Sequence, residues 1–194
     1  MTPDECILQY LSRYIKLDQR EQHFFTGLLR HEEVKKGAQL LQQGEICRFQ
    51  YFVISGCLRT YTVDEHGQEH IIQFSQANWW TSDLYSGLTQ TPAEHGIDAL
   101  APGSVMILPF EKMEWLYAEV PKFERFFRIL YQNAIVSHFR RTRESMELTA
   151  EERYLRFSER YPDLQQLVSQ KHIASYLNIT PEFLSKIRNK IAHR

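Results

Sequence analysis

The segment from Gln170 to Asn189 constrains the fold of this chain more than any other stretch of its sequence. Two short helices that cross at a tight angle need a small residue where they touch, and Ala174 stands at that place. Asn178 follows, a residue that tolerates the left-handed backbone of a tight turn. Thr180 can cap a second helix, and Pro181 suits its first position. A shared apolar core is supplied by Ile173, Leu177, Ile179, Leu184 and Ile187. Together these spacings predict a helix-turn-helix.

Charge is distributed unevenly along the chain. The whole sequence has a net charge of −1, yet residues 170–194 hold five Lys and Arg against the single carboxylate of Glu182. The segment therefore has a net charge of +4, which leaves −5 for the remainder. This asymmetry is typical of a basic nucleic-acid-binding module on a neutral-to-acidic body, although a solvated basic tail gives the same numbers.

The second helix of the motif is predicted to enter the major groove of DNA. Its outward positions carry Glu182, Phe183 and Lys186. Lys186 can donate to guanine, and Glu182 can accept from cytosine N4. The candidates for phosphate contacts are Ser169, Gln170, Thr180, Ser185, Arg188 and Lys190. A helical hairpin without a role in DNA binding is the alternative at this stage.

Residues 34–108 have the pattern of a small antiparallel β-structure. Predicted turns at 55–56, 64–67 and 101–103 separate short apolar runs. The predicted strands are 39–41, 49–54, 58–63, 70–74, 97–100 and 105–108. Such short strands at spacings of roughly 8–12 residues favour a sandwich or a jelly-roll barrel. Residues 4–32, which precede them, have helical periodicity.

Helical periodicity returns after Pro109. A short helix at 110–119 precedes a long one from Pro121 towards Leu148, and Thr149 caps a further helix. The long helix has a wide aromatic stripe that would leave a large bare patch on a monomer. We therefore expect homodimerisation through Phe123, Phe127, Leu130, Ala134 and Phe139. Packing of the stripe against the chain's own barrel is the alternative.

A short-stranded barrel, a long aromatic helix and a C-terminal helix-turn-helix, in this order, resemble the Crp/Fnr family of bacterial transcription regulators. The resemblance extends from about Val34 to the end of the chain. Its markers are Lys36-Gly37, Gly44-Glu45, Tyr51–Arg59, Asp64–Gly67 and His70–Phe74. It implies an α+β fold with N-terminal helices, a jelly-roll β-barrel of the cyclic-nucleotide-binding type, a dimerisation helix and a winged DNA-binding domain.

The resemblance also implies a domain division and a set of partners. The expected domains are a sensor barrel with N-terminal helices at 1–120, a dimerisation helix at 121–148 and a DNA-binding domain at 149–194. A homodimer would bind double-stranded DNA, with RNA polymerase and a small-molecule effector as further candidate partners. The sequence has no apolar run of 18 residues and no N-terminal signal pattern, so we expect a cytoplasmic protein without membrane association.

The sequence departs from the family in its phosphate cassette. Nucleotide-binding members resemble Gly-Glu-Leu followed by Arg-Ser/Thr-Ala, whereas here Asp83-Leu84 is followed by Thr91–Glu94 without an arginine. Burying a phosphate without its cation is costly, so cyclic AMP is not expected as the effector. The predicted effector pocket comprises Trp80, Ser82, Asp83, Leu84, Thr91, Pro92 and Ala93. It holds another small ligand or is a structural relic.

The sequence departs from the family in two further features, the iron–sulfur cluster and the wing of the DNA-binding domain. Cys6 alone cannot hold the N-terminal iron–sulfur cluster of oxygen-sensing members, and no metal or cofactor is predicted. The chain stops four residues after Lys190, so any wing must lie around Leu164–Val168 or be much reduced. No catalytic constellation is recognisable, so an enzyme is not expected. The alternative to a DNA-binding regulator is a ligand- or partner-binding sensor whose output is not DNA binding.

Overall fold

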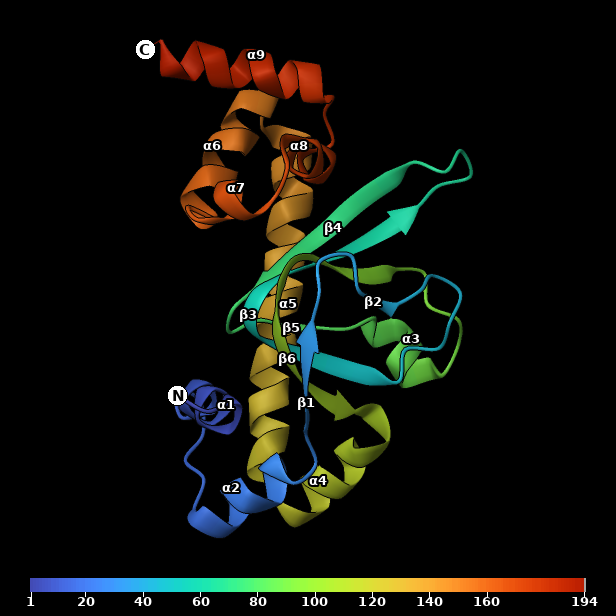
Figure 1. Ribbon diagram of the computed structural model, residues 1–194, viewed down its shortest axis with the longest axis vertical. Helices are drawn as coiled ribbons and strands as arrows, with labels where there is room; N and C mark the ends of the chain where they lie inside the picture. The colour runs from blue at the N-terminus through green and yellow to red at the C-terminus, as the bar shows by residue number, and fades with distance from the viewer. Residues whose placement is uncertain (194) are drawn as a thin grey trace.

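The computed structural model describes residues 1–193 as an antiparallel sheet with helices at both ends of the molecule (Figure 1). The elements are α1 (Pro3–Leu11), α2 (Gln19–Thr26), β1 (Arg30–Val34), β2 (Gln39–Leu41), β3 (Phe49–Val63), β4 (Glu69–Gln76), β5 (Trp80–Thr81), α3 (Leu84–Thr89), β6 (Gly96–Pro109), a 3-10 turn (Phe110–Lys112), α4 (Met113–Glu119), α5 (Lys122–Glu147), α6 (Ala150–Arg160), α7 (Leu164–Leu167), α8 (Gln170–Leu177) and α9 (Pro181–Ala192). The predicted α+β class is confirmed.

The sheet has the order β1-β6-β3-β4, with β2 added to β6 and β5 to β3. Every pair is antiparallel. The predicted turns at 55–56 and 101–103 are wrong, because β3 and β6 run through them as bulged strands. Gly56 has φ +85°, and a Cβ there would lie 2.7 Å from the Pro102 carbonyl oxygen. Two irregular segments therefore face each other and bend one sheet around a core.

The hairpin predicted at residues 64–67 is confirmed. Asp64 Oδ1 accepts hydrogen bonds from the backbone N–H groups of His66 and Gln68, each at 2.9 Å, and Gly67 has φ +76°. The hairpin joins β3 to β4, whose other edge is not paired with a strand of the sheet. This edge faces the C-terminal helices (Figure 1).

Helix α5 runs along most of the molecule and connects its two ends (Figure 1). Its first turns pack with α1, α2 and the sheet in a core that buries Phe123, Phe126 and Phe127 completely or almost completely. Phe123 and Phe127 therefore cannot form part of a dimer interface, which corrects the prediction for these two residues. From Gln132 to Arg140 the helix is exposed.

The long N-terminal helical stretch is also corrected by the structure, because α2 ends at Thr26 and β1 begins at Arg30. Helix α6 begins as predicted: Thr149 and Glu152 form a reciprocal capping box. No wing lies at residues 164–168, where α7 forms a single helical turn and Leu164 is completely buried. No helix within residues 1–193 combines the length and apolarity needed to cross a membrane.

Candidate nucleic-acid interface

Helices α8 and α9 have the geometry of a helix-turn-helix. Ser169 Oγ accepts from the His172 N–H at 3.3 Å and caps α8, and Thr180 Oγ1 accepts from the Phe183 N–H at 3.2 Å and caps α9. Between them Asn178 adopts φ 54° and ψ 49°, the left-handed conformation expected of the turn. Ala174 is completely buried where the helices meet. The local chemistry in the sequence thus produces the predicted arrangement.

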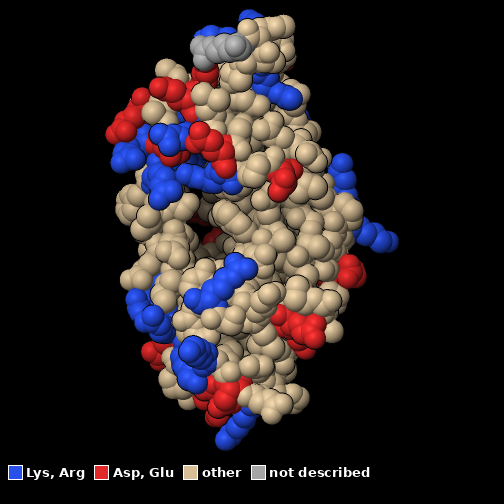
Figure 2. Space-filling view, turned by 90° about the vertical axis from the view of Figure 1, so that its left-hand side faces the viewer, with Lys and Arg blue, Asp and Glu red and all other residues tan. Residues whose placement is uncertain are grey.

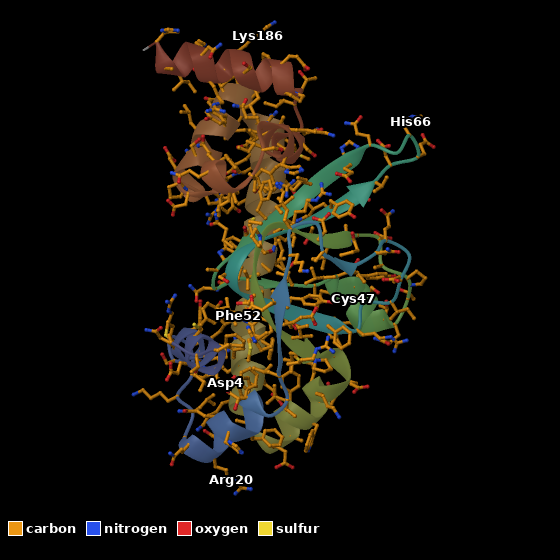
Figure 3. The ribbon with its side chains drawn as sticks, viewed as in Figure 1. Asp4, Arg20, Cys47, Phe52, His66 and Lys186 are labelled. Carbon is orange, nitrogen blue, oxygen red and sulfur yellow. The ribbon has the colours of Figure 1, made fainter. Side chains whose placement is uncertain are left out.

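Helix α9 has one buried face and one exposed face. Leu184 and Ile187 lie in a core shared with α6 and α8. Glu182, Phe183 and Lys186 lie on the opposite side, and Phe183 is 49% exposed although it is a large apolar residue. Lys186 projects from the outer end of the molecule (Figure 3). The exposed face therefore combines an acceptor, an aromatic ring and a cation on a helix that is free to enter a groove.

The residues predicted to contact phosphate lie around this face and differ in their exposure and in whether they are paired within the chain. Ser169, Gln170, Thr180 and Ser185 are exposed. Arg188 is only half-buried. Lys190 Nζ forms a salt bridge with Glu151 of α6. Among the described residues predicted to contact phosphate, Lys190 thus forms an ion pair within the chain, and it would have to exchange Glu151 for a phosphate.

The unpaired edge of β4 is covered by α8. Ser175 Oγ accepts from the Ile71 N–H at 3.0 Å and donates to the Glu69 carbonyl oxygen at 3.0 Å. Arg141 of α5 donates to the Ile71 carbonyl oxygen at 3.2 Å, and its guanidinium lies 4.3 Å from the centre of the Tyr176 ring. We call this set of contacts the α8–β4 junction. No local sequence pattern predicts this junction, because Ser175 and Ile71 are separated by 104 positions.

Aromatic packing extends the junction into a core. Phe74 of β4 lies 5.2 Å from Tyr176 and 6.2 Å from Phe157, measured between ring centres. The same cluster contains Leu184 and Ile187 of α9. The helix-turn-helix is therefore not a separate body at the end of a linker, since it shares its core with the sheet.

A buried charge cluster lies in the sheet near α8. Arg59 makes two hydrogen bonds of 2.8 Å to Asp98 and also binds Glu69. The hydrogen bond from Arg59 lowers the pKa of Glu69. Burial lowers the pKa of His172 of α8, and the positive charge of Arg59 lowers it further. The guanidinium of Arg59 is thus neutralised by the carboxylates of Asp98 and Glu69 within the sheet.

The structure does not gather the seven predicted effector-pocket residues in one place. Trp80 lies in the core against Phe52 and Phe127. Thr91 and Pro92 are exposed, and the backbone of buried Ala93 bonds to Glu45 and Gly44. Ser82, Asp83 and Leu84 line one cavity, and Trp80, Ser82 and Leu84 line a second one.

Asp83 is fully engaged within the fold. Its carboxylate accepts from the backbone N–H groups of Ser86 at 3.0 Å and Glu94 at 3.1 Å, and lies 3.0 Å from His95 Nδ1. Asp83 thus caps α3 and holds the following loop. The carboxylate at the position of the Gly-Glu-Leu glutamate of nucleotide-binding members is thus already bonded within the chain.

The cavity beside these residues has a volume of about 660 Å³ and lies between β4, α3, α5, α6 and α8. We call it the junction cavity. Its wall includes Arg141, Arg153, Arg156 and Arg160 from the helices. Figure 2 shows the molecule from a side on which Lys and Arg side chains gather above a hollow near its middle.

Comparison with known proteins agrees with this architecture. The cyclic nucleotide-binding domain family matches residues 31–120. The fumarate and nitrate reduction regulatory protein of Vibrio cholerae is 26% identical over 94% of this chain and 77% of its own length. The transcriptional activator protein FnrA of Stutzerimonas stutzeri is 26% identical over 94% and 79%.

Solved structures share the fold. FixK2 from Bradyrhizobium japonicum superposes with a TM-score of 0.75 at 17% identity, covering 85% of each chain. A Crp/Fnr-family regulator from Eubacterium rectale gives 0.71 at 17% identity, covering 95% of this chain and 88% of its own. These superpositions show a common fold over 85% and 95% of this chain. The matching domain model, the curated relatives and the solved structures together support a transcriptional regulator of the Crp/Fnr family.

Proposed function

We propose that this regulator binds specific sites on double-stranded DNA as a homodimer, with α9 in the major groove. The observation that carries the proposal is the exposed face of α9, on which Glu182, Phe183 and Lys186 project away from a packed core. The apolar side of α9 is buried, and its polar side is exposed and carries more basic than acidic residues. Such a helix fits a major groove in size and charge.

The residues divide by what they can reach. Lys186 would donate to guanine O6 or N7, Glu182 would accept from cytosine N4, and the Phe183 ring would contact a thymine methyl group. Phosphates would be bound by Ser169, Gln170, Thr180, Ser185, Arg188 and, after release from Glu151, Lys190. These contacts orient α9 without reading sequence.

The dimer interface is proposed on the second half of α5. Ile135, Phe139 and Met146 are 56%, 70% and 80% exposed and follow one another at intervals of four and seven residues. This is the spacing of a helix–helix seam, and so large an apolar stripe is unfavourable in water. Beside it runs an apolar groove of about 950 Å³, lined by Leu130, Ala134 and other residues, where a second copy of α5 can pack.

We propose a separate role for each of three consecutive parts of the chain. Residues 1–120 would form the sensor, 121–148 the dimerisation helix and 149–194 the DNA-binding domain. The first turns of α5 pack into the sensor core, so the helix is anchored at one end and available for pairing further along. RNA polymerase as a partner stays a prediction.

Selection from a random DNA pool, followed by fluorescence anisotropy on the enriched site, tests DNA binding. We expect a two-fold site with half-sites about 34 Å apart and an affinity that falls steeply with salt. Lys186→Ala and Arg188→Ala should each weaken binding, whereas Lys16→Ala, which removes an equal charge from the other end of the chain, should not. The proposal fails if all three variants bind alike. If no sequence is enriched, a sensor with a different output is favoured.

Sedimentation equilibrium tests the dimer. Phe139→Asp places a charge in the proposed seam and should shift the protein to monomer, because a buried carboxylate has no partner there. Leu88→Asp introduces the same group at an exposed apolar position of α3 and should leave the mass unchanged. Equal behaviour of the two variants would rule out this seam.

A further inference from the structure

The walls of the junction cavity have an excess of positive charge. Arg141 of α5 and Arg153, Arg156 and Arg160 of α6 line it, against the carboxylates of Asp83 and Glu144. Asp83 is occupied by two backbone N–H groups and His95, as described above. Glu144 lies 3.6 Å from Arg160 and offsets that one cation. The other three arginines form no ion pair within the described residues, although the pKa of Glu152 is lowered by hydrogen bonds from Thr149 and by the nearby charge of Arg156.

Two of these arginines have unused hydrogen-bonding capacity. Arg156 is exposed to the cavity and makes no hydrogen bond or ion pair that the structure shows among residues 1–193. Arg153 donates to the carbonyl oxygens of Leu148 at 2.9 Å and Leu177 at 3.3 Å, yet its buried Nε has no partner. Buried donors are nearly always paired, so an unpaired one in a cavity wall indicates a missing acceptor.

The location of the cavity argues against DNA as that acceptor. None of the nine predicted DNA-binding residues lines it. Its wall is formed by β4, α3, α5, α6 and α8 and includes no residue of α9, so a duplex bound along α9 would lie outside it. A small molecule can enter, because the volume of about 660 Å³ is that of an ordinary ligand pocket.

We propose that the junction cavity binds a small multivalent anion, bearing phosphate or carboxylate groups, through Arg141, Arg153 and Arg156. The cations come from the helices and not from the cassette segment of the sheet, where the arginine is missing. Guanidinium groups suit this chemistry, because they bind phosphate and carboxylate oxygens in pairs.

Binding there would be coupled to the helix-turn-helix. Arg141 also holds the Ile71 carbonyl oxygen and stacks on Tyr176, so an anion that draws this guanidinium into the cavity weakens the α8–β4 junction. The effect on DNA affinity rests on the proposed function, whereas anion binding itself does not. The two can therefore be measured separately.

Isothermal titration calorimetry of the full chain with sodium pyrophosphate and with citrate, at an ionic strength held constant with sodium chloride, tests the site. We expect saturable binding of at least one anion, and a loss of about tenfold or more in Arg156→Gln and Arg141→Gln. Arg125→Gln removes an exposed arginine from the same helix α5, outside the cavity, and should bind as the native chain does. Saturation by pyrophosphate alone assigns the site to phosphate chemistry, and saturation by citrate alone to carboxylate chemistry.

Arg156→Gln carries most weight, because this side chain makes no structural bond whose loss would unfold the protein. The proposal is overturned if neither anion saturates, or if Arg125→Gln weakens binding as much as Arg156→Gln. The anisotropy assay with and without the bound anion tests the coupling. An unchanged DNA affinity would refute the coupling and leave the site standing, and a failed DNA selection would refute the proposed function without affecting the calorimetry.

Discussion

Replacing Ser175 by alanine tests whether one hydroxyl holds the helix-turn-helix on the sheet. Ser175→Ala removes the acceptor for the Ile71 N–H and the donor to the Glu69 carbonyl oxygen, both at 3.0 Å. Ile71 is buried, and its amide points away from β3, so no strand can replace the lost partner. Glu69 is exposed, and water can reach its carbonyl group.

The two bonds therefore differ in what their loss costs. A buried amide left without a partner costs about 1–3 kcal/mol, and the solvated carbonyl adds little. We expect the free energy of unfolding in urea to fall by about 1–3 kcal/mol with an unchanged slope. Exchange of the Ile71 amide hydrogen should be about tenfold faster or more, because each 1.4 kcal/mol of lost protection is a factor of ten.

Ser185→Ala is the matched control in the absence of DNA, since Ser185 is exposed on α9 and makes no hydrogen bond that the structure shows within residues 1–193. Its effect should stay within about 0.5 kcal/mol. If both variants unfold at the same urea concentration, and Ile71 exchanges at the native rate in both, the hydroxyl does not hold α8 on β4. A control variant that is slightly more stable than the native chain would not change this conclusion.

Three other perturbations address the turn, the buried charges and pH. Asn178 has φ 54°, so Asn178→Ala should lower stability by about 1 kcal/mol in thermal unfolding. Asn178→Gly should not lower it. The reverse order of stability would mean that the turn is not left-handed. Arg59→Met leaves the buried carboxylate of Asp98 without its cation and should lower the free energy of unfolding in urea by about 3–5 kcal/mol. A decrease below about 1 kcal/mol would show that Asp98 is solvated. Because burial and Arg59 lower the pKa of His172, the unfolded chain takes up a proton below about pH 6.5 that the folded chain does not. The contribution of His172 to stability is thus present above that pH and lost as the pH falls, and His172→Gln should flatten the decline between pH 7 and pH 5 in urea titrations.

The helix-turn-helix was predictable because its determinants are local. Ala174, Asn178 and Thr180 act on backbone within a few positions, so their spacing in the sequence is nearly their spacing in space. The hairpin at 64–67 was predictable for the same reason. Gly56 misled the prediction, because glycine marks both a turn and a bulge, and the segment that decides between them is Pro102-Gly103, far along the chain.

The junction and the effector region could not be predicted in this way. Ser175, Arg141 and Ile71 come from three elements, and no local pattern marks any of them. The aromatic stripe of α5 was recognised as a whole, but its division into a buried and an exposed half depends on where the sensor core ends, at about Tyr131. Periodicity gives the face of a helix and not the length over which a neighbour covers it.

The shared core decides how a change at the junction would reach DNA. Helices α8 and α9 bury Ala174, Leu184 and Ile187 against one another, so α9 must follow any movement of α8 on β4. The other attachment of the helix-turn-helix is α5, which in the proposed dimer is fixed by its partner. The separation of two α9 helices is then set by the α5 pair together with the α8–β4 junction. Beside the packing of Phe74 on Tyr176, the junction contains a few hydrogen bonds and one stacked arginine, and these polar contacts are the ones that a small charged ligand can alter.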